Sequence, residues 1–169
     1  MLDGAIKDQQ TATADGKLTR TLLEGVTQKE VSNIFSNDAA TTEIYRPEWP
    51  VGPDQIRHMI HAILRANAIS AWHIHEYQTD TIFVTQGSIK LVLFDDRPNS
   101  STRGQVNVFH LSRMRPILTT IPPGIWHGLH NIDHAESSFI NYFDRPYVYS
   151  DPDEWRLPFD TNKIPYQFR

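Results

Sequence analysis

The feature that most constrains this sequence is a succession of short apolar segments that alternate with a period of two and are separated by turn-forming residues. Within residues 88–93, apolar side chains recur at every second position, at Ile89, Leu91 and Leu93. A period of two is that of a β-strand with one buried face. Seven or more short strands with few helices are typical of an antiparallel sandwich or barrel. We predict strands at Ile56–Leu64, Ala71–His75, Asp80–Gln86, Ser88–Phe94, Gln105–Leu111, Leu118–Ile121 and Ser138–Phe143.

The length of 169 residues fits one domain, because domains commonly contain about 100–150 residues. We place this domain at residues 20–169. Residues 1–19 are polar and aperiodic, which predicts a flexible N-terminal arm. The tail after Tyr147 is rich in Pro, Asp and aromatic residues and is too apolar for a solvated linker. We expect it to pack against the domain or a neighbouring subunit.

One short helix is predicted before the strands begin. The segment Thr27-Gln-Lys-Glu30 has the form of a capping box. Val31, Ile34 and Phe35 follow at helical spacing. We expect this helix to pack against the strands and to take no part in chemistry.

Composition and charge exclude several classes of partner. Sixteen Lys and Arg against twenty Asp and Glu give a net charge of −4 without a basic run, so nucleic acid is not an expected partner. No apolar stretch approaches the length of a membrane span, and the first twenty residues lack the features of a secretory leader. We therefore expect no membrane association and a cytoplasmic location. The chain has no Cys, so a metal would have to be held by His, Asp or Glu.

The eight histidines include one pair with informative spacing. His73 and His75 lie two residues apart on a predicted strand, so both imidazoles lie on one face, a spacing that suits two ligands of one ion. Asp80 follows five residues later and would face the other way unless residues 76–79 form a turn. A further histidine, His127, follows the turn-forming segment Pro122-Pro-Gly124.

These two patterns resemble the two motifs of the cupins, a superfamily of small double-stranded β-barrels with a jelly-roll topology. The matching residues are His73, His75, Asp80 and Gly87 in the first motif and Pro122, Gly124, His127 and Asn131 in the second. Two positions depart from the motifs: Asp80 stands where the superfamily usually has Glu, and Pro116 stands where the second motif usually opens with Gly. The resemblance implies an all-β cupin barrel, to which we add the short N-terminal helix.

The same resemblance implies a metal site formed by His73, His75, Asp80 and His127. Three imidazoles and a carboxylate suit a divalent ion such as Fe, Mn, Ni, Co or Zn. The alternative is that these side chains line a polar interior without metal. Gln78 could hydrogen-bond a ligand or satisfy the turn. The other five histidines lack such spacing, and we assign them surface or supporting roles; they are His58, His61, His110, His130 and His134.

A narrower resemblance, from Leu23 onward, is to the dTDP-4-dehydrorhamnose 3,5-epimerase branch of the cupins. It is carried by Asp95-x-Arg97-x-x-Ser100-x-Thr102-x-Gly104 and by Ile121-Pro-Pro-Gly124-x-x-His127-Gly128. The branch implies removal of a proton beside a ketone by a histidine base, stabilisation of the enolate by a lysine, and reprotonation by a tyrosine on the opposite face. His73 falls at the position of the base. The branch also implies a homodimer that pairs through N-terminal strands.

Several of the branch's catalytic and phosphate-binding residues are absent from this sequence. Asp80 stands in place of the lysine, and Phe139 or Ile140 in place of the tyrosine, for which Tyr142 is the nearest substitute. Ser70 and Ala40 stand where the branch has arginines that pair with phosphate. The exchange of Lys for Asp80 converts a pocket for an enolate into one better suited to a cation.

Three functions remain open on this sequence. The first is an epimerase-like enzyme acting on a keto-sugar or another carbonyl compound, with His73 and Tyr142 as catalytic residues and a metal in the role of the lysine. The second is a metal-dependent oxygenase-type cupin, and the third is a non-catalytic cupin that binds a carbohydrate or metabolite. In each case the ligand is a small molecule. The predicted substrate-binding residues are Trp72, Gln78, Trp126, Phe139 and Asn141.

Overall fold

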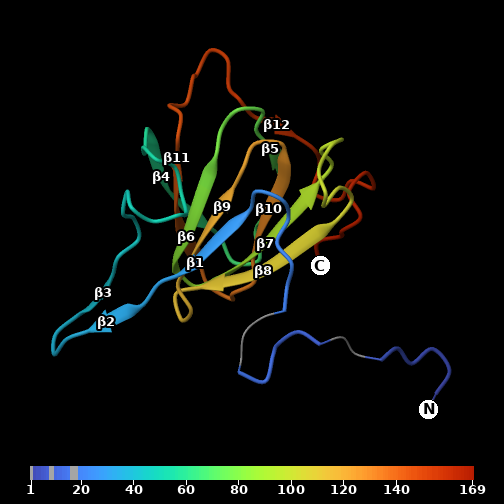
Figure 1. The fold of residues 1–169 in the computed structure, drawn as a ribbon, viewed down its shortest axis with the longest axis horizontal. Helices are drawn as coiled ribbons and strands as arrows, with labels where there is room; N and C mark the ends of the chain where they lie inside the picture. The colour runs from blue at the N-terminus through green and yellow to red at the C-terminus, as the bar shows by residue number, and fades with distance from the viewer. Residues whose placement is uncertain (1, 8–9, 16–18) are drawn as a thin grey trace.

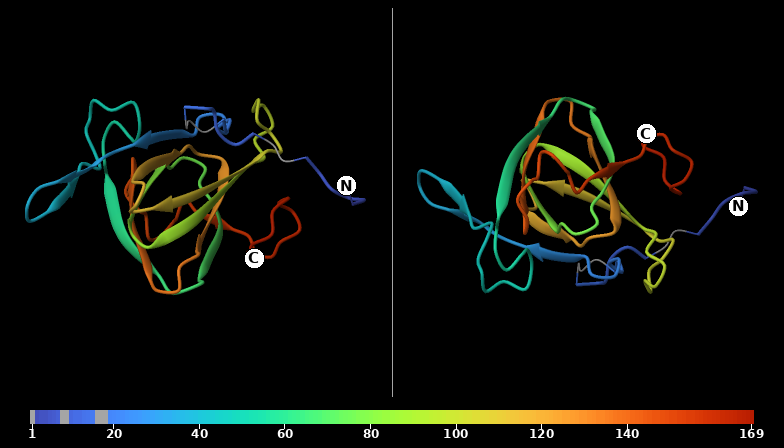
Figure 2. Two further views of the ribbon diagram at one scale, coloured as in Figure 1. Left: turned by 90° about the horizontal axis from the view of Figure 1, so that it is seen from below. Right: turned by 90° about the horizontal axis from the view of Figure 1, so that it is seen from above.

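The computed structural model describes residues 2–7, 10–15 and 19–169. Two five-stranded sheets face each other and form the body of the molecule (Figures 1 and 2). The first sheet contains, in spatial order, β1 (Thr27–Glu30), β9 (Ile117–Ile121), β6 (Asp80–Gln86), β11 (Ser137–Phe143) and β4 (His58–Leu64). The second contains β12 (Trp155–Arg156), β5 (Ile69–Ile74), β10 (Ile125–Asn131), β7 (Ser88–Asp95) and β8 (Val106–Ser112). A separate hairpin consists of β2 (Asn33–Phe35) and β3 (Ala40–Thr42).

Antiparallel pairing sets which side chains lie at the same level of each sheet. In the first sheet, His58 of β4 is opposite Phe143 of β11, and Phe143 is opposite Asp80 of β6. In the second sheet, His127 of β10 is opposite His73 of β5. Side chains directly opposite each other on one face are neighbours. Two rows of chemically active side chains therefore result from pairing between strands that are distant in sequence.

The main core lies between the sheets and consists of alternate residues of their strands. It includes Ile82 of β6, Leu91 and Leu93 of β7, and Leu129 of β10. Complete burial of one such side chain contributes about 1.5–3 kcal/mol. The alternation predicted for residues 88–93 therefore places the apolar face of β7 in this core.

The tail packs on the outer face of the second sheet. Ile164 and Phe168 are buried there against Trp72, with the Trp72 and Phe168 ring centroids 5.0 Å apart. This confirms the expectation that the tail after Tyr147 packs against the domain. The connecting residues form β12, so the tail also brings Glu154 to the edge of β5.

The predicted helix is wrong: residues 27–35 form strands, and the described residues contain no helix. The backbone of Thr27–Glu30 pairs with β9, and the Val31 amide donates to Pro116 O at 3.0 Å. Ile34 and Phe35, which the helix was expected to bury, are 64% and 76% exposed. β-branched residues such as Thr27, Val31 and Ile34 favour extended backbone, and pairing with β9 outweighs the capping signal.

The expectation of a closed barrel is also wrong. Within the described residues, β1 and β4 are the edges of the first sheet and β12 and β8 are the edges of the second, and no ladder joins one sheet to the other. β12 has only two residues, too few to continue the pairing. The interdigitated side chains of the core therefore hold the sheets together as a sandwich.

The segment from Asp95 to Gly104 has a structural role. The fully buried Asp95 carboxylate accepts hydrogen bonds from Arg97, Ser100 and Thr102 at 2.5–3.0 Å. Burial works to raise the pKa of Asp95, but the Arg97 guanidinium and the two hydroxyls hold it well below its usual value. Thr102 Oγ1 also accepts from the Glu24 amide at 2.9 Å. This motif thus fixes the chain before β1 to the second sheet.

The predicted N-terminal arm, residues 1–19, lies partly outside the described residues. Its described parts are exposed and belong to neither sheet. The structure describes no helix that is long and apolar enough to cross a bilayer.

Candidate functional site

A cavity of about 990 Å³ lies between the two sheets. Its first wall is formed by β4, β6 and β11, its second by β5 and β10, and residues 145–156 border one end. Polar side chains, including His58, Asp80 and His127, lie near that end, whereas Leu64 and Leu129 line the other. The cavity therefore combines an apolar floor with a polar entrance, the usual composition of a small-molecule site.

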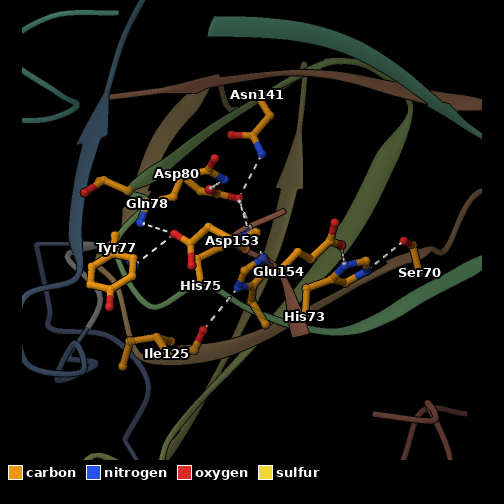
Figure 3. Close-up of polar contacts among 12 residues, drawn as sticks. Ser70, His73, His75, Tyr77, Gln78, Asp80, Ile125, Asn141, Asp153 and Glu154 are labelled. Carbon is orange, nitrogen blue, oxygen red and sulfur yellow. Dashed lines mark hydrogen bonds and ion pairs between the residues drawn. The ribbon is translucent and has the colours of Figure 1, made fainter. Parts of the chain in front are cut away.

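Two imidazoles and one carboxylate converge in this cavity (Figure 3). His75 Nε2 and His127 Nε2 each lie 3.6 Å from Asp80 Oδ2. The ligand atoms of these three residues lie within 4.8 Å of one another. His73 is beside this group: its ring is stacked on that of His127, with centroids 5.8 Å apart. The structure thus brings together three of the four predicted metal ligands, with the fourth next to them.

Backbone carbonyls fix the two imidazoles from behind. His75 Nδ1 contacts Asp153 O, and His127 Nδ1 lies 3.1 Å from Ile125 O. A carbonyl oxygen only accepts, so each Nδ1 must carry the proton when the ring is neutral. Each Nε2 then presents its lone pair toward Asp80.

The Asp80 carboxylate is buried and held by two amides. Gln78 Nε2 donates to Oδ1 at 2.8 Å, and Asn141 Nδ2 donates to Oδ2 at 3.0 Å. Burial works to raise the pKa of Asp80, but its hydrogen bond to His75 and the positive charges of the neighbouring imidazoles lower it. Asp80 therefore remains an anion that attracts a cation.

The two histidines have opposite tendencies to hold a proton. Burial works to lower the pKa of His75, but hydrogen bonding and charge from Asp80 raise it to about 8. Burial lowers the pKa of His127 to about 4, against the attraction of Asp80. The group thus favours one positive charge near Asp80.

A turn at residues 76–79, the condition stated for bringing Asp80 to His75, connects β5 of the second sheet to β6 of the first, so that both side chains face the cavity. The Asp153 carboxylate accepts hydrogen bonds from the backbone amides of Glu76, Tyr77 and Gln78 at 2.8–2.9 Å. Three charge-assisted bonds to successive amides fix the course of this turn. Asp153 therefore supports the site from the tail, a role that no local sequence pattern indicates.

His73 forms a separate pair with Glu154 (Figure 3). His73 Nδ1 lies 2.7 Å from Glu154 Oε1, and His73 Nε2 lies 3.1 Å from the Ser70 hydroxyl. Burial works to raise the pKa of Glu154, but its bonds to His73 and Arg156 lower it. The carboxylate therefore accepts a hydrogen bond from Nδ1–H of His73, which leaves the lone pair of the neutral ring on Nε2, on the cavity side. No sequence pattern indicates Glu154, because 81 residues separate it from His73.

Seven predicted site residues line the cavity: His73, His75, Gln78, Asp80, His127, Phe139 and Asn141. Trp72 and Trp126 do not. They belong to the cluster on the outer face of the second sheet, because alternate residues of a strand point to opposite faces. The expectation that they shape the pocket is therefore corrected.

Tyr142 is also misplaced by the prediction. Its neighbours Asn141 and Phe143 line the cavity, so Tyr142 points to the outer face of β11. There its hydroxyl donates to Ile44 O at 2.9 Å, and burial raises its pKa above the usual value. The structure thus leaves Tyr142 without access to a ligand in the cavity.

Two buried polar atoms of cavity-lining residues have no hydrogen-bond partner among the described residues. They are Asn141 Oδ1 and His58 Nδ1. The orientation of the Asn141 amide is fixed, since its NH₂ group must face the Asp80 carboxylate. Unpartnered buried polar atoms are costly, and both of these belong to residues that line the cavity. His58 was assigned a surface or supporting role from the sequence.

A comparison with protein-family models gives no match. Among curated proteins, the chain is 32% identical over 119 residues to the probable low-salt glycan biosynthesis epimerase Agl13 of Haloferax volcanii, covering 70% of this chain and 76% of that protein. It is 33% identical over 100 residues to the spore coat polysaccharide biosynthesis protein SpsL of Bacillus subtilis, covering 59% of this chain and 66% of that protein.

Solved structures show a similar fold. The dTDP sugar isomerase of Desulfovibrio desulfuricans G20 superposes with a TM-score of 0.80 at 26% identity, over 88% of this chain and 94% of that one. The dTDP-4-dehydrorhamnose 3,5-epimerase of Elizabethkingia anophelis NUHP1 has the same jelly-roll fold, with a TM-score of 0.74 at 18% identity over 89% and 85% of the two chains. The chain therefore belongs to the sugar-biosynthesis epimerases with the dTDP-4-dehydrorhamnose 3,5-epimerase-like cupin fold.

Proposed function

We propose that this protein epimerises a keto-sugar by moving a proton at a carbon next to the ketone, with His73 as the base. The observation that carries this proposal is the His73–Glu154 pair at the wall of a cavity large enough for a sugar. Glu154 holds the Nδ1 proton, so Nε2 is the atom that accepts a proton from the substrate. The Ser70 hydroxyl, 3.1 Å from Nε2, would yield this position to the substrate.

The charges of the pair suit this step. When the C–H bond breaks, its proton passes to His73 Nε2 and its electron pair moves onto the carbonyl oxygen. The imidazolium that forms is stabilised by the anionic Glu154 carboxylate. A positive group is then needed near the developing enolate, and Asp80 stands where the family resemblance implies a lysine.

The group of His75, Asp80 and His127 fits a divalent metal ion in this role. Two imidazole nitrogens and a carboxylate oxygen point at one another, an arrangement that suits a positive charge between them, either a proton or a metal ion. The carbonyl behind each Nδ1 is the support that metal-ligating histidines usually have. A bound ion would stabilise negative charge on the substrate oxygen. We propose these three residues as the ligands and leave His73 out, since the group whose ligand atoms lie within 4.8 Å of one another consists of His75, Asp80 and His127.

The oxygenase alternative requires His73 as a fourth ligand, and His73 lies outside the group of three residues whose ligand atoms converge. The alternative of a non-catalytic binding protein differs from the proposed function in an experiment: it predicts binding of the ligand without turnover. Both alternatives share the small-molecule ligand but predict no dependence of epimerisation on Glu154.

Replacing Glu154 by Gln is expected to lower kcat about 10- to 150-fold while KM and the melting temperature change little. The reason is the loss of a charged hydrogen bond, which is worth about 1.5–3 kcal/mol. The measurement is the rate of epimerisation of a dTDP-linked 4-keto-6-deoxyhexose, followed by NMR. Glu154→Asp should recover part of the rate, and Glu136→Gln, at an exposed acid, is the matched control. An unchanged kcat in Glu154→Gln would refute the proposed pair.

We also propose that the protein is a homodimer. The β2–β3 hairpin projects from the body of the molecule (Figures 1 and 2), and the side chains of Ile34 and Phe35 on it are exposed. A second copy would cover them. Sedimentation should give twice the chain mass for the wild type and a monomer for Ile34→Ser/Phe35→Ser, and a monomeric wild type would contradict the proposal.

A further inference from the structure

Epimerisation needs proton donors and acceptors on both faces of the substrate. If a proton leaves from one face and returns to the same face, the configuration is retained. His73 belongs to β5 of the second sheet, so the group that delivers the new proton must lie on the opposite wall, which β4, β6 and β11 form. Tyr142, the tyrosine considered for this role, points away from the cavity.

Few groups on that wall can give up a proton. Most of its side chains carry only carbon and hydrogen: Ile60, Ala62, Leu64, Ile82, Phe139 and Phe143. Asp80 is held as an anion, and its carboxylate oxygens already accept hydrogen bonds from Gln78 and Asn141. The amide of Asn141 is not an acid. Among the described residues of these three strands that line the cavity, the remaining proton donor is His58.

His58 lies at the same height along its sheet as Asp80. Through Phe143, His58 and Asp80 lie in one cross-strand row of the first sheet. The His58 and Phe143 rings are packed with centroids 5.3 Å apart. Buried Nδ1 has no partner, whereas the residue as a whole is half-buried. His58 lines the cavity, and the half-buried ring leaves a part that a ligand in the cavity and water can reach.

We propose, on the basis of the epimerase function above, that His58 is the general acid that protonates the enolate on the face opposite to His73. His73 takes the proton as the C–H bond breaks, and the electron pair moves to the carbonyl oxygen. The pair then returns to carbon, which forms a new C–H bond with the proton of the His58 imidazolium. His73 loses its proton to water and His58 regains one, so both groups are reset and the substrate has been inverted.

Three tyrosines near the entrance are rival donors. Tyr77, Tyr147 and Tyr149 line the cavity from loops. The Tyr77 hydroxyl donates to Glu76 at 2.7 Å, and the rings of Tyr147 and Tyr149 pack on each other with centroids 5.0 Å apart. They are 56%, 40% and 88% exposed, so water competes for their hydroxyls. The test includes each of them.

The experiment is incubation of a dTDP-linked 4-keto-6-deoxyhexose in D₂O, with exchange and inversion followed separately by NMR. In the wild type, deuterium should enter beside the ketone together with inversion. In His58→Gln, inversion should fall about 10²–10⁴-fold, while exchange with retained configuration continues because His73 still works. His61→Gln, at an exposed position of the same strand, should behave as the wild type.

Other outcomes separate this inference from the proposed function. Normal inversion in His58→Gln, or equal loss of exchange and inversion in a variant with the wild-type melting temperature, overturns the role of His58. Separation of exchange from inversion by a Tyr→Phe change at 77, 147 or 149, but not by His58→Gln, also overturns it. Absence of exchange in the wild type would instead refute the epimerase function itself.

Discussion

Replacement of His73 by Asn is expected to reduce epimerisation about 10²–10⁴-fold, the usual contribution of a positioned general base. Asparagine can still bond to Glu154 but cannot accept a proton from carbon. The rate of inversion of a dTDP-linked 4-keto-6-deoxyhexose measures this effect, and a thermal melt should show that the fold is kept. The loss should exceed that in Glu154→Gln, because Glu154 acts only through His73.

The matched control is His134→Asn, at an exposed histidine outside the cavity. It should retain the wild-type rate. A His73→Asn variant with an unchanged rate would remove His73 from the reaction. Retained ligand binding without turnover in the wild type would favour the non-catalytic alternative.

A comparably large effect on metal content is expected when two of the proposed metal ligands are removed. The wild type, reconstituted anaerobically with excess Fe, Mn, Ni, Co or Zn and then dialysed, should hold about one ion per chain, because three protein ligands with open positions are typical of a catalytic metal site. His75→Ala/His127→Ala should hold almost none, since Asp80 alone cannot replace two imidazoles. Elemental mass spectrometry of the untagged proteins measures the difference.

His110→Ala/His134→Ala, which removes two exposed histidines, is the control and should bind metal as the wild type does. A metal-free wild type after reconstitution would contradict the proposed ligands. The positive charge next to Asp80 would then be a proton, shared between His75 and Asp80.

Most of the strands could be predicted from the sequence, because their apolar and polar residues alternate or their apolar residues form continuous runs. The segment Ile125–Asn131 was recognised only as a motif, although it forms the central strand β10. Residues 27–35 carried a helical signal, which nothing local corrects. The extended state of β1 depends on pairing with β9, a contact about 90 residues away along the chain, and β2 pairs with β3.

The candidate site could be predicted where it follows from short-range spacing. The two-residue period placed His73 and His75 on one face, and the same period, applied to Trp72 and Trp126, would have placed these on the outside. Glu154 and Asp153 could not be found, since they reach the site only through the path of the tail. His58 has no motif, and its relevance depends on the pairing of β4 with β11.

The central claim, that His73 moves a proton beside the ketone of a sugar, is tested most directly by solvent exchange in the wild type and His73→Asn. In D₂O, the wild type should place deuterium at a carbon flanking the ketone of a dTDP-linked 4-keto-6-deoxyhexose, and His73→Asn should place almost none there. Equal incorporation by the two proteins, or none by the wild type, would contradict the claim.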